Sequence, residues 1–247
     1  MVDIEKYINR SFYNPFLDSV AFEIRFPSTI RVIKDFLEFQ ELINEDYPNF
    51  AEEHLFLDFT DRTKIPENLR KYEFSDTNKQ NRVRISMNAL TIITTNYKKF
   101  DSFSKQIYDV TDKFVNCFKI ISCLRIGLRY FNIYSLNNDL INSLRESEKL
   151  FVPFINTELM PYNEIFSQNI EIRRNLVENN KITIRNKLNY NKEKNSFQHI
   201  LDFDAYNQDK IQITDYEKKL LDLRKVEKTR FLLSVTEEFM SKMEFID

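Results

Sequence analysis

Arg125 and Arg129 are well placed to bind an anion, because they flank Gly127, the only glycine among the 247 residues. Side chains alternate between the two faces of a strand, so all three residues would share one face. A glycine there would let a ligand approach the sheet closely, and the two guanidinium groups could bind phosphate or carboxylate. The commoner arrangement is a central strand whose arginines pair with acids on neighbouring strands.

A second segment contains Asp202 and Asp204, which alternate with apolar residues and would emerge on one strand face. Two such carboxylates can hold a divalent cation in phosphoryl-transfer sites, with Asp58 or Glu171 as a third ligand if the strands are adjacent. More simply, the two acids would pair across the sheet with the arginines of the first segment. We therefore predict no metal site and no cofactor, and retain only Asp202 and Asp204 as metal candidates.

Basic residues alternate along other predicted strands as well. If they share the open face of the sheet, they could bind a nucleic-acid backbone through charge. The candidates for binding phosphate or another ligand are Arg125, Gly127, Arg129, Arg82, Arg84 and Arg185. The net charge of −2 and the isoelectric point near 5.9 argue against a dedicated nucleic-acid binder. A solvated strand face is the commoner explanation.

The shortage of glycine excludes several kinds of catalytic site. Phosphate-binding loops, dinucleotide fingerprints and nucleophile elbows all need glycine where the backbone turns sharply or approaches a ligand. Two cysteines and two histidines show no zinc-ligand spacing, so Cys117 and Cys123 are expected as buried thiols and His199 as a core histidine. We assign no catalytic residue and favour a protein that is not an enzyme.

Scarce glycine also means that tight turns must use asparagine, which tolerates positive φ better than most residues. The predicted turns contain Asn78, Asn81, Asn179, Asn180, Asn189, Asn191 and Asn195. The amino end is polar and lacks the pattern of a signal peptide, and no apolar run is long enough to span a membrane. We expect a cytoplasmic protein that does not bind a membrane.

Hydrophobic periodicity predicts the same order of elements twice, in residues 1–118 and 119–247. The first half has strands at 20–26, 55–59, 72–74, 83–87 and 90–95, with helices at 28–43 and 101–118. The second half has strands at 123–133, 170–172, 182–188, 197–205 and 211–213, with helices at 135–144 and 214–239. Short polar turns between successive strands favour antiparallel pairing, with helices on one face.

The predicted class is therefore α+β, with two β-α-β(3-4)-α units in one compact body. The doubled order resembles the TATA-binding-protein-like fold, in which two such units form one curved sheet. That resemblance implies an architecture and no function.

Short motifs also resemble a sporadically distributed family of prokaryotic proteins of unknown function and of about this length. They are Tyr13-Asn14-Pro15-Phe16-Leu17, Phe22-Glu23-Ile24-Arg25-Phe26, Arg125-Ile126-Gly127-Leu128-Arg129-Tyr130-Phe131-Asn132 and Leu201-Asp202-Phe203-Asp204-Ala205-Tyr206. The resemblance would span most of the chain. It implies no activity and no catalytic residue.

Three functional hypotheses follow. The first is a non-enzymatic interaction protein that binds a protein partner, as a partner or immunity component of a prokaryotic system. The 12 tyrosines and 23 phenylalanines could supply anchors for such an interface. The second is a nucleic-acid or nucleotide-binding module centred on Arg125 and Arg129. The third, given least weight, is a metal-dependent phosphoryl-transfer enzyme using Asp202 and Asp204.

Overall fold

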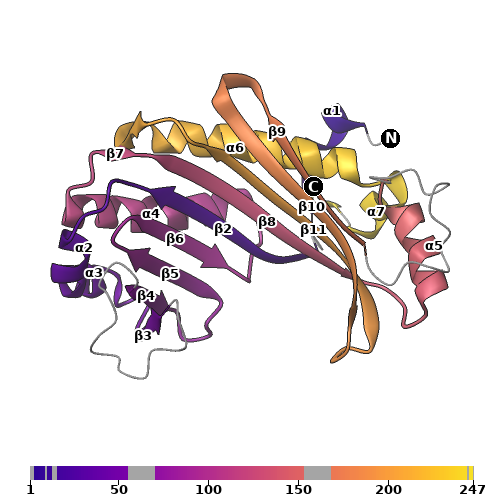
Figure 1. Ribbon diagram of the computed structural model, residues 1–247, viewed down its shortest axis with the longest axis horizontal. Coiled ribbons are helices and arrows are strands. Elements are labelled where there is room, and N and C mark those ends of the chain that lie inside the picture. Colours follow the sequence, from indigo (N-terminus) through magenta and orange to yellow (C-terminus); the bar gives the residue numbers. More distant parts are fainter. Residues whose placement is uncertain are drawn as a thin grey trace. The chain divides into compact units, whose positions relative to one another are not determined.

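Helices and antiparallel strands are both abundant in the computed structural model, which describes residues 3–8, 10–12, 16–54, 70–152, 168–243 and 245–246 (Figure 1). The predicted α+β class is confirmed.

The first half contains α1 (Ile4–Tyr7), β1 (Ser11–Phe12), β2 (Leu17–Arg25), α2 (Arg31–Lys34), α3 (Phe36–Ile43), β3 (Asn49–His54), β4 (Arg70–Ser75), β5 (Asn81–Ser86), β6 (Ala89–Thr94) and α4 (Phe100–Phe118). The second half contains β7 (Ser122–Cys123), β8 (Arg125–Ser135), α5 (Leu140–Leu150), β9 (Gln168–Asn175), η5 (Val177–Asn179), β10 (Asn180–Asn191), β11 (Ser196–Asn207), β12 (Ile211–Gln212), η6 (Ile213–Asp215), α6 (Tyr216–Ser234), α7 (Glu237–Lys242) and β13 (Phe245–Ile246). Within each half, a strand and at least one helix precede a run of strands and a long helix, α4 or α6, with additional short elements at both ends of the chain.

Contacts between residues divide the chain into two compact units that are not its two halves. Unit 1 combines Met1–Ser19, Arg129–Ala205 and Asp222–Asp247, and unit 2 combines Val20–Leu128 with Tyr206–Leu221. Strands β2, β8 and β11 and helix α6 each begin in one unit and end in the other. The division at residue 118 into two repeated units stays a prediction.

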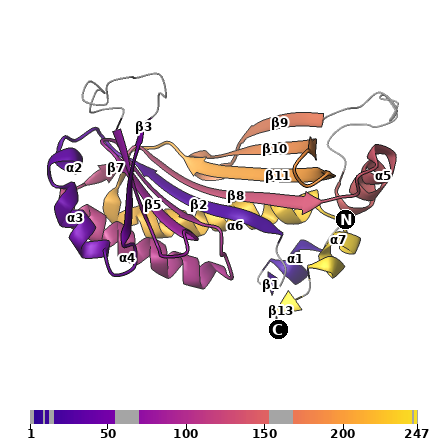
Figure 2. The same ribbon diagram turned by 90° about the horizontal axis from the view of Figure 1, so that it is seen from below.

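Unit 2 contains strands in the hydrogen-bonded order β3-β4-β5-β6-β2-β8. The period of two along β2 sets its faces, because Phe22 and Ile24 are buried whereas Glu23 is only half-buried. Figure 2 shows α4 on one face of β5 and β6. Phe39 of α3 joins helices to strands there, since its ring centroid lies 6.0 Å from that of Phe74 and 5.4 Å from that of Phe114.

Unit 1 contains strands in the order β8-β11-β10-β9. Strands β9 and β10 are antiparallel, and their register places Arg185 opposite Glu171. The part of α6 in this unit covers one face of β11, where the ring centroids of Phe203 and Phe231 lie 6.2 Å apart (Figure 2). Even-numbered residues of β11 therefore point to the opposite face, which we call the open face.

Three predicted helices differ from those observed. The first is divided into α2 and α3 at Asp35, whose φ of −108° and ψ of 14° interrupt the helix. The second begins later, with Asp139 as its N-cap, because β8 continues through Ser135. The last is interrupted after Ser234, and Thr236 then caps α7 by accepting a hydrogen bond from the backbone N–H of Phe239.

The strand predicted at 55–59 lies outside the described residues, and β3 precedes it at Asn49–His54. Within the described parts of the chain, no helix is both long and apolar enough to cross a membrane.

Positive φ angles occur at non-glycine residues, as scarce glycine requires. In the described residues they are Phe16, Lys79, Lys119, Glu178, Asn179 and Asn195. Two of the seven asparagines predicted to lie in turns are among them. Phe16 is the bulkiest, and its strained backbone is compensated by ring contacts with Tyr134 and Phe239 at centroid distances of 5.0 and 5.3 Å.

Replacing Lys119 by glycine should stabilise the protein. Lys119 ends α4 with φ 56° and ψ 45°, a conformation that glycine adopts without steric cost. We expect Lys119→Gly to raise the free energy of unfolding by about 0.5–1 kcal/mol, measured by urea denaturation. Lys105→Gly, in the exposed middle of α4, is the matched control and should lower it by about 1 kcal/mol. A neutral or destabilising Lys119→Gly would contradict the argument.

Candidate binding surfaces

A row of alternating charges crosses the open face of unit 1. It consists of Arg129 on β8, Asp202 on β11, Arg185 on β10, and Glu171 and Arg173 on β9. We call it the charged row. The strand period predicts its existence, because these side chains all point away from α6.

Asp202 is the most buried member of the charged row, with 2% of its side chain exposed. Nε and Nη2 of Arg129 donate hydrogen bonds of 2.7 and 2.8 Å to its two carboxylate oxygens. Nη1 of Arg185 adds a third bond of 3.1 Å from the other side. The carboxylate is therefore buried between two cations, and the two-pronged contact with Arg129 fixes its orientation.

The outer part of the charged row continues the alternation. Nε of Arg185 lies 2.7 Å from Glu171, which also binds Arg173 at 2.6 Å. The hydrogen bonds from Arg185 and Arg173 lower the pKa of Glu171, and the hydrogen bonds to Asp202 raise the pKa of Arg129. Glu171 and Arg129 are thus held in their charged forms by their neighbours.

The charged row bears on two of the alternatives that the sequence left open, ion pairing and metal binding. Asp202 does pair across the sheet with Arg129, and both of its oxygens are engaged by guanidinium groups. The described residues contain no group of three or more His, Cys, Asp or Glu side chains able to hold a metal ion. Of the proposed third ligands, Glu171 binds arginines and Asp58 lies outside the described residues.

Arg125 and Gly127 lie in unit 2 and form a second structural arrangement. Nη1 of Arg125 lies 2.5 Å from Glu23 on β2, and the guanidinium carbon lies 4.7 Å from the ring centroid of Tyr206. A Cβ atom on Gly127 would come within 2.6 Å of that same Nη1. The single glycine thus gives room to an arginine side chain of its own strand.

Arg82 and Arg84, the other candidates in unit 2, differ from each other. Nε of Arg84 lies 2.5 Å from Glu73 on β4. The buried Nε of Arg82 has no hydrogen-bond partner among the described residues. The basic strand face predicted from the sequence is therefore mostly neutralised by acids on adjacent strands.

The two cysteines and the Ser147–His199 pair are poorly suited to catalysis. Burial raises the pKa of Cys117 to about 11 and that of Cys123 to about 12, so both stay protonated thiols, as predicted. Ser147 Oγ lies 2.7 Å from Nδ1 of His199, but burial lowers the pKa of that histidine to about 3. A general base works best with a pKa near the operating pH, and no third described group binds Nε2 of His199.

Unit 2 also carries an apolar surface that the sequence did not reveal. The rings of Phe36 on α3 and Tyr72 on β4 stack with centroids 4.6 Å apart and planes 8° apart. Phe50 on β3 stacks beside Tyr72 at 6.0 Å. Tyr72 is buried beneath it, whereas 45% of Phe50 and 60% of Leu37, which follows Phe36 in α3, are exposed. We call Phe36, Leu37, Phe50 and Tyr72 the aromatic edge, because β3 is the last strand of its sheet order.

No protein-family model matches this chain. No curated protein matches it either. Among solved structures, it is similar to the di-domain ARO/CYC StfQ from the steffimycin biosynthetic pathway, at 8% identity and a TM-score of 0.16. The alignment covers 87% of this chain and 96% of that one. A similarity this low says nothing about function.

The effect of a side chain at Gly127 should change sign with the residue at 125. In the natural background, Gly127→Ala must displace the Arg125 guanidinium, and we expect a loss of about 1–2 kcal/mol from the partly buried ion pair. In an Arg125→Ala background the obstacle is gone, and alanine should gain about 0.5 kcal/mol over glycine in a strand. Urea denaturation of the natural protein, Gly127→Ala, Arg125→Ala and the double variant measures the effect of alanine at position 127 in both backgrounds. Equal effects in the two backgrounds would show that Arg125 is not the reason for the glycine.

Neutralising Asp202 should destabilise the protein without affecting any metal dependence. Asp202→Asn leaves two guanidinium groups facing an amide, and we expect a loss of about 2–3 kcal/mol, because Arg129 is half exposed and partly screened. Glu171→Gln removes a more exposed partner and should cost less. Thermal unfolding of the natural protein and both variants, with and without added Mg²⁺, measures the loss of stability and any effect of the metal ion. Stabilisation of the natural protein by Mg²⁺ that Asp202→Asn abolishes would instead support a metal site.

Proposed function

We propose that this protein is a non-enzymatic interaction protein that binds an extended segment of a protein partner along β3. The observation that carries the proposal is the exposure of Phe50, which lies on this last strand of unit 2 with its ring against a stack of aromatic side chains. An exposed aromatic group on the last strand of a sheet order favours the addition of a partner strand. The partner would contribute both backbone hydrogen bonds and an apolar side chain.

The two outer strands of the protein support this choice by their difference. Strand β9, the last strand of unit 1, carries Glu171, Arg173 and Arg174, and charged side chains are a usual protection against unwanted pairing. Strand β3 carries Glu52 and Glu53 but no lysine or arginine, and the exposed ring of Phe50 lies on the same strand. Aromatic residues are also enriched in the buried centres of protein interfaces.

The charged row, the two thiols and His199 favour binding over catalysis. The acids of the charged row bind arginines, the thiols are protonated, and the imidazole of His199 is a weak base. The role of a partner or immunity component of a prokaryotic system belongs to the same proposal. So does the resemblance to a family of unknown function.

Binding of a nucleic acid or nucleotide to the basic strand face is the second candidate. Its support is the exposure of Arg173 and Arg129, whose side chains are 74% and 48% exposed. The acids that neutralise Arg84, Arg125 and Arg185 weigh against it. Phosphate recognition would have to break these pairs, and titration with labelled DNA over a salt series would show a steep salt dependence.

Photo-crosslinking through the aromatic edge tests the proposal. A photoreactive phenylalanine analogue replaces Leu37, or in a matched control Val177, which is 85% exposed but lies in unit 1 at the turn η5. In the native cell we expect one discrete protein adduct from position 37 and none from position 177. The same adducts from both positions, or none from position 37, would contradict a partner at this edge.

Reconstitution with the purified partner then gives the affinity. Phe50→Asp should weaken binding at least tenfold, because a charge replaces an apolar anchor, and should also lower the melting temperature, because the ring packs on Tyr72 and Phe74. Ile121→Asp, a second exposed apolar position at 76% exposure, should leave affinity unchanged. Hydrogen exchange should slow in Asn49–His54 on binding, because strand addition occupies its backbone groups. Unchanged exchange there would exclude strand addition.

A further inference from the structure

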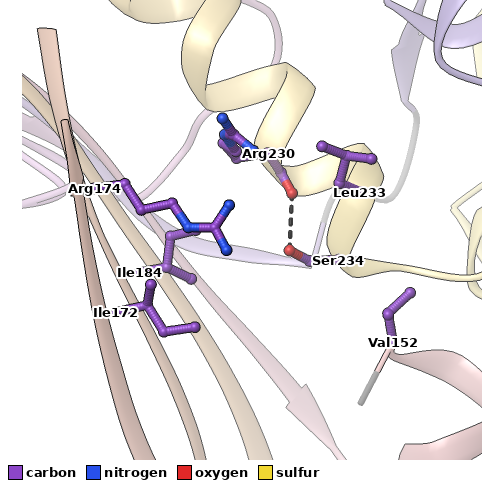
Figure 3. Close-up of a pocket in the computed structure, with 7 residues that line it drawn as sticks. All are labelled: Val152, Ile172, Arg174, Ile184, Arg230, Leu233 and Ser234. Atoms are coloured by element: carbon purple, nitrogen blue, oxygen red, sulfur yellow. Dashed lines mark hydrogen bonds between the residues drawn. The ribbon is translucent and has the colours of Figure 1, made fainter. Parts of the chain in front are cut away.

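Unit 1 contains a cavity of about 280 Å³ that none of the functional hypotheses uses. It lies between strands β9 and β10, the carboxyl-terminal part of α6, and Val152 after α5 (Figure 3). Ligand cavities in proteins are usually about 300–1,000 Å³. This one lies just below that range, which restricts it to a small ligand.

Two arginines from different elements meet at this cavity. Arg174 comes from β9 and Arg230 from α6. Figure 3 shows Arg174 extending from its strand toward α6, on the side where Arg230 lies, with Val152 on the far side. Within the described part of the chain, neither guanidinium has an ion-pair partner, and the seven residues that line the cavity include no acid.

The strand period explains why Arg174 points here. Its neighbour Arg173 belongs to the charged row on the open face, so Arg174 must point to the face covered by α6. The register places Arg174 opposite Ile182 and Ile172 opposite Ile184. A cation therefore emerges among apolar side chains on the helix-covered face.

The rest of the lining is apolar apart from one hydroxyl. Val152, Ile172, Ile184 and Leu233 supply the apolar walls. The hydroxyl of Ser234 donates a hydrogen bond of 2.8 Å to the backbone carbonyl of Arg230, so its proton is already used. The free donors that remain in the cavity are thus those of the two guanidinium groups.

We propose that this cavity binds a small amphipathic anion, whose carboxylate or phosphate monoester is held by Arg174 and Arg230 and whose short apolar body lies against Val152, Ile172 and Leu233. Two like charges that face one cavity without an acid repel each other, and an anion between them removes that repulsion. Guanidinium groups suit carboxylate and phosphate because they donate two parallel hydrogen bonds. The site lies in unit 1 and is independent of the aromatic edge in unit 2.

Isothermal titration calorimetry with four probes tests the proposal on the full-length protein. Octanoate and octyl phosphate carry both features, acetate has the charge without the tail, and 1-octanol has the tail without the charge. We expect saturable 1:1 binding of octanoate, octyl phosphate or both, at least tenfold tighter than acetate and 1-octanol. The preferred head group then identifies the source as a carboxylic acid or a phosphate ester. Binding of 1-octanol equal to that of octanoate, or no binding of either anion, would overturn the proposal.

Variants assign the binding to this cavity. Arg174→Gln and Arg230→Gln should each weaken octanoate binding about tenfold, whereas Arg173→Gln, on the opposite face of the same strand, should leave it unchanged. Leu233→Asn should weaken octanoate binding and spare acetate binding, with Leu221→Asn, also exposed on α6, as its control. If Arg230→Gln lowers the melting temperature, Arg230→Lys retains the charge and should weaken binding only partly. Equal losses in Arg173→Gln and Arg174→Gln would place the ligand elsewhere.

Discussion

The open face of unit 1 depends on the carboxylate of Asp202. Only 2% of this side chain is exposed, and its position between Arg129 and Arg185 makes the arrangement of three strands electrostatically possible. Without the negative charge, two guanidinium groups on either side of β11 would face each other in a partly buried environment, where repulsion is stronger than in water. The charged row is therefore best understood as a device that fixes the neighbours of β11, at the expense of any free phosphate-binding surface.

The space beside Gly127 is likewise used for packing within the protein and not for a ligand. A glycine beside two arginines is compatible with close approach of a ligand, but here the space is filled by the guanidinium of Arg125. That side chain is held by Glu23 on one side and Tyr206 on the other. The chain uses its one glycine to pack an ion pair, and places Lys119 and Glu178 in left-handed conformations instead.

Periodicity predicted what depends on neighbouring residues in the sequence. The alternation in β2 and β11 gave the correct faces, so that Asp202 points away from α6 as expected. The sequence also predicted that Asp202 would form a cross-strand ion pair with an arginine such as Arg129. By contrast, the partner of Arg125 is Glu23, which lies 102 residues away and is determined by which strands are adjacent. Helix ends were missed where a local cap or kink, such as Asp35 or Asp139, competes with the apolar pattern.

The contrast between Arg173 and Arg174 separates structural from binding arginines more clearly than the sequence could. Successive residues of a strand point to opposite faces, so one of this pair had to face a covering helix, and that signal was available. What no pattern supplies is the identity of the covering segment, because α6 approaches β9 through tertiary packing. On the open face Arg173 meets Glu171, whereas on the covered face Arg174 meets another arginine and apolar walls. An arginine opposite an acid, such as Arg173, thus stabilises the fold, whereas an arginine with no acid opposite, such as Arg174, is available to bind a ligand.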